Sequence, residues 1–355
     1  MDRNVAIAYL QSIMGSNKAM GLVAQGDFQK WVSTAGDNVR RKYFNGCWVM
    51  SPKGSTAGKR MCFFVHGKIE RDESVKRAID SLLSNRGFHA LFGSISRSGL
   101  GVFYCIPKGD PNTTNLGNLK WALFRYQNEN LTEINATQFF MAWPGTGRVS
   151  GGRAWEKHVR ERYQTLDSEI LESLVLNQVF FSSLVKGQMR KPVADPYDVD
   201  GFLVSYQGKI LPMEIKEKFP FKAGNIELLG IDAGRILMLL RLCLPLDCNG
   251  LYIIREVEDS QERKFLGWKI TTLDSIVMNA NWTLQAGGIG MTGGPTQTVT
   301  LPYKTYSDLT PSSFSDENLH KISEFSKIIK EKAAAFQSEV EKFIQAAASQ
   351  PTLSV

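Results

Sequence analysis

The segment DVDGFLVSYQGKILPMEIKEK, residues 198–218, constrains the fold more than any other part of the sequence. Its pattern is that of two short apolar strands around a polar turn, yet acidic and basic side chains lie inside the strands. A charged group in a buried strand costs free energy unless something pairs it, and a divalent metal ion is one such partner. The segment therefore predicts a β-hairpin that carries a site.

The charged residues of this hairpin are expected on one face. Alternate residues of a strand share a face, so Glu214 and Lys216 point to the same side, opposite to the apolar residues of their strand. A three-residue Tyr-Gln-Gly loop would place Asp200 opposite Glu214, with Cβ atoms about 5 Å apart. A two-residue loop would aim Asp200 at the other face. We expect the three-residue loop, or a bulge with the same effect.

Two carboxylates this close repel each other unless a cation lies between them. Oxygen ligands without a nearby histidine or thiol suit Mg²⁺, with Mn²⁺ as a substitute, better than zinc. Lys216 can orient a water, help to deprotonate it, or stabilise charge on a phosphoryl oxygen. The set favours metal-dependent hydrolysis of a phosphodiester. The alternative is an exposed hairpin edge with a cross-strand ion pair, which would contribute little to stability.

Asp200, thirteen further residues, and then the Glu-Ile-Lys of Glu214 and Lys216 form a pattern that resembles the signature of the PD-(D/E)XK nuclease superfamily, which includes most restriction endonucleases. The surrounding order of helix, hairpin, helix, strand and strand also matches. The resemblance covers about residues 150–280 and implies a restriction-endonuclease-like α/β core, with a central mixed sheet flanked by helices. It implies Asp200 and Glu214 as Mg²⁺ ligands, and Lys216 as the group that positions the attacking water.

The resemblance also suggests a further catalytic acid and leaves two candidates for the metal-binding aspartate. The segment GGRAWEKHV resembles the beginning of many such domains, which implies Glu156 as a further catalytic acid. The family has a proline directly before the aspartate, but in this sequence a valine precedes Asp200. The nearby proline lies two residues before Asp198. Asp198 is therefore an alternative metal ligand.

A proline and several glycines at residues 143–152 predict a linker that divides the chain. Residues 1–145 are expected to form an N-terminal α/β domain that helps to hold or recognise DNA. Residues 150–310 would form the catalytic domain. Residues 315–348 predict a C-terminal amphipathic helix that packs on the core or on a dimer partner.

Local patterns give the elements of the N-terminal part. Residues 2–33 have apolar residues at helical spacing, and residues 61–69 predict a strand. Residues 70–87 predict a helix that ends at Gly87. Residues 88–95 and 101–107 predict a β-hairpin.

Composition bounds the class of protein and its partners. The 355 residues, 43% apolar and 22% charged, predict a globular protein with a substantial core. The formal charge of +7 slightly favours a polyanion such as double-stranded DNA. Candidate phosphate contacts are Arg40, Arg41, Lys42, Lys59, Arg60 and Lys304. Five cysteines without metal-ligand spacing, no long apolar run and no signal-peptide pattern predict a reduced cytoplasmic protein without a membrane span.

The sequence therefore predicts a Mg²⁺-dependent endodeoxyribonuclease that cuts double-stranded DNA, with restriction of foreign DNA as the favoured role. A palindromic target would imply a homodimer. One alternative is a repair, recombination or mobile-element nuclease of the same fold that acts on DNA structure or on single strands. Alternatives of other classes are a DNA-binding defence subunit that no longer cuts, and a small-molecule enzyme in which the hairpin pattern is coincidental.

Overall fold

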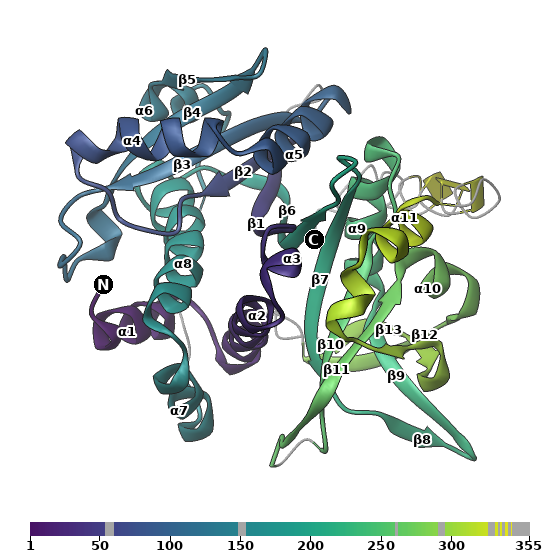
Figure 1. Ribbon diagram of the computed structural model, residues 1–355. Coiled ribbons are helices and arrows are strands. Elements are labelled where there is room, and N and C mark those ends of the chain that lie inside the picture. Colours follow the sequence, from purple (N-terminus) through teal and green to yellow (C-terminus); the bar gives the residue numbers. More distant parts are fainter. Residues whose placement is uncertain are drawn as a thin grey trace, which may run out of the picture.

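The structure is a computed structural model that describes residues 1–53, 60–147, 154–259, 262–289 and 295–325, together with 331–332, 334–335, 338–339 and 342. Its helices, labelled as in Figure 1, are α1 (Arg3–Ile13), α2 (Ser16–Thr34), α3 (Asp37–Arg40), α4 (Asp72–Leu83), α5 (Arg86–Arg97), α6 (Ala136–Met141), α7 (Lys157–Thr165), α8 (Ser168–Val179), α9 (Ala233–Leu246), α10 (Leu273–Asn279) and α11 (Asp316–Ser323). A π-helical segment, Phe180–Gln188, continues α8. The strands are β1 (Tyr43–Pro52), β2 (Met61–Val65), β3 (Gly101–Lys108), β4 (Lys120–Gln127), β5 (Asn130–Ile134), β6 (Val193–Val204), β7 (Ile210–Lys218), β8 (Phe221–Ala223), β9 (Ile226–Asp232), β10 (Leu251–Val257), β11 (Phe265–Thr272), β12 (Asn281–Ile289), β13 (Pro295–Pro302) and β14 (Ser307–Asp308).

The described strands form a large mixed sheet and a smaller antiparallel one. The order in the large sheet is β14-β11-β10-β7-β6-β1-β2-β3-β4-β5 (Figure 1). Its parallel pairs are β2 with β3 and β7 with β10, and the other neighbours are antiparallel. The smaller sheet has the order β12-β13-β9-β8. The chain is thus a mixed α/β protein, as the sequence predicted in outline.

Helices cover both faces of the large sheet (Figure 1). Trp48 and Phe63 lie in one apolar cluster with residues of α1 and α8, whereas Cys47 and Phe64 lie in another with residues of α4 and α5. Neighbouring residues of β1 and β2 therefore face opposite layers, which explains why these strands are apolar on both sides.

The strands of the predicted hairpin lie in the middle of the large sheet. Phe28 of α2 shares an apolar cluster with Met213 and Ile215 of β7, so α2 packs on the apolar face of the second hairpin strand. After the hairpin, α9 leads to β10, which lies parallel to β7. The predicted order of helix, hairpin, helix, strand and strand is confirmed, with the unpredicted strands β8 and β9 inserted before α9.

The hairpin predicted in the N-terminal part is wrong in its first half. Its first segment is α5, because Phe88, Leu91 and Ile95 recur at helical spacing and are buried in the cluster under that helix. Gly87 lies in the first turn of α5 and does not end α4. The side chain of Asn85 caps α5 by accepting hydrogen bonds from the N–H groups of Gly87 and Phe88. The second segment is β3, as expected for a strand.

The large sheet runs across the predicted domain boundary. β1 pairs antiparallel with β6, from Tyr43 opposite Leu203 to Pro52 opposite Val193. The N-terminal part therefore supplies a neighbour to the first strand of the hairpin. Residues 148–153 of the predicted linker lie outside the described residues, and the division into domains stays a prediction.

The described part of the C-terminal segment begins with α11, which places Leu319 in the same apolar cluster as Phe28 and Met213. Most of the predicted helix after residue 325 lies outside the described residues. All five cysteines are free and buried, as expected for packing residues. Among the described helices, none combines the length and the apolar character that crossing a membrane requires.

Candidate active site

β6 and β7 form the predicted hairpin in the predicted register. Gly201 pairs with Met213, and the pairing continues with the same offset to the turn, which confirms the three-residue loop. The ladder stops one position before Asp200 and Glu214. The predicted register of the hairpin is therefore confirmed, and the roles of its charged residues stay a prediction.

The two strands of the hairpin diverge from this point. β6 continues along β1 as far as Val193, and β7 continues along β10 as far as Lys218. The ladder between β6 and β7 that the structure describes stops at Gly201. Asp200 and Glu214 thus lie where the sheet divides, and charged side chains occupy the space between the diverging strands.

Asp200 occupies a break in β6. Val199 and Phe202 share one apolar cluster although they are three residues apart, so the alternation of the strand is interrupted between them. The Asp200 carboxylate turns toward β7, where its Oδ2 accepts the backbone N–H of Ile215 at 2.6 Å. Its Oδ1 accepts Nε2 of Gln25 on α2, also at 2.6 Å. Asp200 therefore replaces a strand carbonyl as the partner of Ile215 and joins α2 to β7.

β1 approaches β6 closely at the same break. A Cβ atom on Gly46 would lie 1.6 Å from the carbonyl oxygen of Val199 and 2.8 Å from the carbonyl carbon of Asp200. No side chain fits in that space. Gly46 therefore allows the close backbone approach that fixes Asp200 from the side of β1.

Glu214 is completely buried and is surrounded by cationic and hydrogen-bonding groups. The hydroxyl of Tyr197 donates to its Oε2 at 2.9 Å. Nζ of Lys216 lies 2.5 Å from its Oε1, and Nε of Arg235 lies 3.7 Å from the same oxygen. Nζ of Lys216 also lies 3.8 Å from Oδ2 of Asp200, so the ammonium group stands between the two carboxylates.

Burial and charge set the protonation of this group. Burial and the nearby charge of Glu214 raise the pKa of Asp200 well above its usual value. Burial alone would lower the pKa of Lys216, but Glu214 and Asp200 outweigh it and raise that pKa. Lys216 is therefore an ammonium group, which can orient a water or stabilise an oxyanion but cannot accept a proton from water.

Asp198 belongs to a different ion pair. Its Oδ1 lies 2.9 Å from Nη1 of Arg235. Burial raises the pKa of Asp198, but Arg235 and then Lys18 outweigh it and bring this pKa to about 2. Asp198 thus pairs with Arg235, whereas Asp200 contacts Gln25 and the backbone of Ile215. Both aspartates stay candidate ligands.

The donor set of the site fits Mg²⁺. No group of three or more acidic, histidine or cysteine side chains suited to a metal occurs among the described residues. Mg²⁺ does not need one, because it commonly keeps several waters and takes one or two protein carboxylates. Oε1 of Glu214 is buried without an aligned hydrogen-bond donor, although Lys216 approaches it as an ion pair. Each oxygen of Asp200 accepts one hydrogen bond and keeps a further lone pair for a metal.

Glu156 is not part of this cluster. It is the N-cap residue of α7, its side chain is 70% exposed, and its carboxylate lies 3.5 Å from Nδ1 of His158. Its backbone N–H donates to Oγ of Ser16 at the beginning of α2. The structure therefore does not bring Glu156 into contact with Asp200, Glu214 or Lys216, and its catalytic role stays a prediction. The structure instead brings Gln25, a residue that the sequence did not single out, to Asp200.

Lys42, one of the candidate phosphate contacts, lies in the interior. Its side chain is only 1% exposed. Nζ donates to the carbonyl oxygen of Phe314 at 3.0 Å and lies 3.0 Å from Oδ2 of Asp316. Lys42 therefore holds the chain before β1 against the segment that contains α11.

The other candidate DNA contacts differ in exposure. Arg40 and Arg41 are exposed and pair with the aspartate that begins α3. Lys304 is exposed. Arg60 is half-buried and donates to a backbone carbonyl of α9 at 2.8 Å. Lys59 lies outside the described residues.

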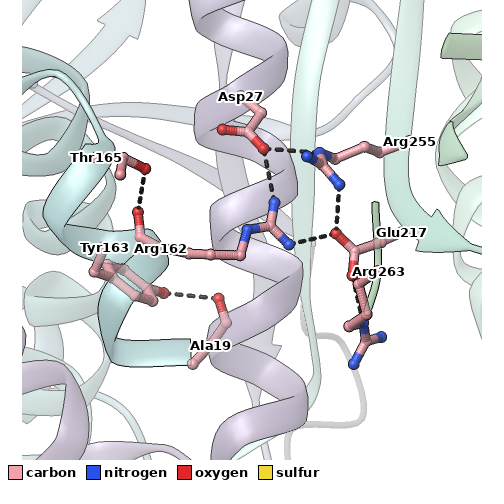
Figure 2. Close-up of polar contacts among 8 residues, drawn as sticks. All are labelled: Ala19, Asp27, Arg162, Tyr163, Thr165, Glu217, Arg255 and Arg263. Atoms are coloured by element: carbon pink, nitrogen blue, oxygen red, sulfur yellow. Dashed lines mark hydrogen bonds and ion pairs between the residues drawn. The ribbon is translucent and has the colours of Figure 1, made fainter. Parts of the chain in front are cut away.

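A second charge cluster fixes α2 and α7 to the end of β7 (Figure 2). Its central residue is Glu217, whose side chain is 3% exposed. This carboxylate accepts hydrogen bonds from the guanidinium groups of Arg162 (2.5 Å), Arg255 (3.0 Å) and Arg263 (2.8 Å). The first two also contact Asp27 of α2, both at 2.7 Å. Because α2 carries the glutamine that contacts the site, this cluster helps to position that glutamine.

Comparisons with protein-family models, with curated proteins and with solved structures found no match to this chain. The function of the site is therefore inferred from its geometry and chemistry.

Proposed function

We propose that the protein is a Mg²⁺-dependent endodeoxyribonuclease that hydrolyses phosphodiester bonds of double-stranded DNA, with restriction of foreign DNA as its favoured role. The observation that carries this proposal is the position of the Lys216 ammonium group. It lies 2.5 Å from Glu214 and 3.8 Å from Asp200, at the point where the two strands diverge. An acid pair beside an ammonium group suits a metal ion and an anionic substrate together.

Stability alone does not explain this arrangement. Asp200 is 5% exposed and Glu214 is 0% exposed, so the exposed hairpin edge that was the alternative is absent here. Burying ion pairs costs several kcal/mol per ion before any attraction is regained, and apolar residues in their place are often as stable or more so. Buried charges without a stability advantage are typical of functional sites.

The core fold that we propose is restriction-endonuclease-like. In support, the hairpin is flanked by β1 on the side of β6 and by the parallel strand β10 on the side of β7. α2 packs on the same strands and contacts the site through Gln25. The proposed core thus includes β1 and α2, which precede the region of sequence resemblance.

In the proposed reaction, a water attacks phosphorus in line, a new O–P bond forms, and the bond to the 3′ oxygen breaks, which leaves a 5′-phosphate and a 3′-hydroxyl. The water gives up its proton to solvent and the 3′ oxygen takes a proton from solvent. Bound Mg²⁺ would polarise a phosphoryl oxygen and neutralise part of the developing charge. Asp200 and Glu214 would hold it. Lys216 would orient the water and stabilise charge on the phosphate. Tyr197 and Gln25 fix the orientation of the two carboxylates through their hydrogen bonds.

Cleavage of supercoiled plasmid by the purified protein tests the proposal. Millimolar Mg²⁺ should give nicked or linear plasmid, whereas Ca²⁺ or a chelator should give none, and Lys216→Met should be inactive while folded. A discrete fragment pattern would support restriction, and a homodimer in solution would then fit a palindromic target. Cleavage confined to branched or single-stranded DNA would favour the repair or recombination alternative. Binding without cleavage by the wild-type protein would contradict the nuclease and favour the non-cutting subunit.

A further inference from the structure

Four cationic side chains from three elements lie near the proposed catalytic centre. Lys216 and Lys218 lie on the same face of β7, since they are two residues apart. Arg235 comes from α9 and Lys18 from α2. Lys18 and Lys218 are each close enough to Lys216 for their charges to interact. The cations therefore form one group around the proposed catalytic centre.

Within the part of the chain that the structure describes, two members of this group have an ion-pair partner. Lys216 pairs with Glu214, and Arg235 pairs with Asp198. Among the residues that the structure describes, no carboxylate lies within ion-pair distance of Lys18 or Lys218.

Both unpaired lysines are partly removed from water. Lys18 is half-buried, with Nζ 5.3 Å from the centre of the Trp48 ring. Burial lowers its pKa, and the attraction of Asp198 does not compensate. Lys218 is also half-buried, and burial together with the charge of Lys216 lowers its pKa. An ammonium group taken from water without a counter-ion costs free energy, which an anionic ligand would return.

We propose that Lys18 and Lys218 bind the phosphodiester backbone of DNA beside Lys216, and thereby place the scissile phosphate against Asp200 and Glu214. This inference rests on the proposed nuclease function and adds the residues that hold its substrate. Lys218 lies about 7 Å from Lys216 along β7, at about 3.3 Å per residue, and Lys18 approaches from α2. The two lysines therefore come from different elements of the fold.

The salt dependence of DNA binding tests this role directly. Each phosphate contact contributes about 0.9 to the slope of log K against log salt concentration. Lys18→Met and Lys218→Met keep an apolar stem and remove the charge. Lys120→Met is a matched control, because Lys120 is exposed on β4, four strands away from β6 in the sheet. Binding of a labelled DNA duplex is measured by fluorescence anisotropy in Ca²⁺ over a series of salt concentrations.

In each methionine variant, we expect the salt-dependence slope to become smaller in magnitude by about 0.9 and the affinity for DNA to fall about tenfold. The control Lys120→Met should keep the wild-type slope and affinity. Lys18→Arg should keep the wild-type slope. Melting temperatures should be unchanged or higher in Lys18→Met and Lys218→Met, because each removes a charge whose burial outweighs the attraction of the nearby carboxylates. A lower melting temperature together with a wild-type slope would instead indicate a structural role and overturn the inference.

Failure of this inference can be distinguished from failure of the proposed function. If the wild-type protein cleaves plasmid in Mg²⁺ and both methionine variants bind with the wild-type slope, only the role of Lys18 and Lys218 is overturned. If the wild-type protein binds DNA without cleaving it and the variants lose slope, the lysine contacts stand and the nuclease does not. A wild-type protein that binds no DNA overturns both.

Discussion

Glu217→Gln removes the central negative charge of the cluster that joins β7, α2 and α7. Three guanidinium groups donate to this carboxylate at 2.5–3.0 Å, and its side chain is 3% exposed. The substitution leaves three cations with the single carboxylate of Asp27. Removing one partner from a buried charge network costs about 3–5 kcal/mol, because the remaining charges stay desolvated and unpaired.

This loss translates into a measurable change in melting temperature. Unfolding entropy of about 2.1 cal/mol/K per residue over 355 residues predicts a fall of about 4–7 °C. We expect the lower end of that range, since the three guanidinium side chains are 12–27% exposed and water screens part of the charge. Thermal melts followed by circular dichroism measure the shift. Glu133→Gln, at an exposed glutamate of β5, is the matched control and should shift by less than about 1 °C.

A double variant separates the charge effect from a general effect of the substitution. Arg255→Gln in the Glu217→Gln background removes one of the three cations that have lost this carboxylate, so the double variant should lose less than the sum of the two single losses. Glu217→Gln melting within about 1 °C of the control, or strictly additive losses, would refute the reasoning.

Three further substitutions test the site and its surroundings. Gln25→Ala removes the donor to one buried oxygen of Asp200, so we expect a loss of about 1–3 kcal/mol in urea unfolding and slower plasmid cleavage; wild-type stability and rate would contradict this. Gly46→Ala would place a Cβ 1.6 Å from the carbonyl oxygen of Val199, so little folded protein is expected by circular dichroism and size-exclusion chromatography, and a native spectrum would be the contrary result. Lys42→Met breaks a buried ion pair and should lower the melting temperature without changing the salt slope of DNA binding, whereas a slope reduced by about 0.9 would mean that Lys42 contacts phosphate.

The centre of the site could be predicted from the sequence because it depends on local rules. Strand alternation places Glu214 and Lys216 on one face, and the loop length decides what lies opposite. The register that the structure shows agrees with this. The interruption of β6 at Asp200 could not be predicted in the same way, because it depends on the close approach of β1 at Gly46.

The contribution of α2 could not be predicted because it depends on packing between distant segments. Gln25 and Asp200 are 175 residues apart in the sequence. A lone glutamine after Leu22, Val23 and Ala24 is a weak signal of a buried polar position, but nothing in the sequence names its partner. Glu156 matched the expected pattern, yet it lies at an exposed helix N-terminus.

The error at α5 has a different cause. Phe88, Leu91, Phe92 and Ile95 recur at helical spacing, but the segment is short and rich in aromatic residues, which also favour strands. For such a segment, periodicity alone does not distinguish a helix from a strand. The packing of these four residues on β3 and β4, in one buried cluster, resolves it as a helix.

The most direct test of the proposed active site compares two glutamates in the same plasmid assay. Glu214 is fully buried beside Lys216, whereas Glu156 is 70% exposed at the beginning of α7. Single-turnover cleavage in Mg²⁺ is measured for the wild-type protein, Glu214→Gln and Glu156→Gln, each with its melting temperature. We expect Glu156→Gln to cleave at the wild-type rate and folded Glu214→Gln to be inactive. Wild-type cleavage by Glu214→Gln, or loss of cleavage only in Glu156→Gln, would contradict an active site in the hairpin of β6 and β7.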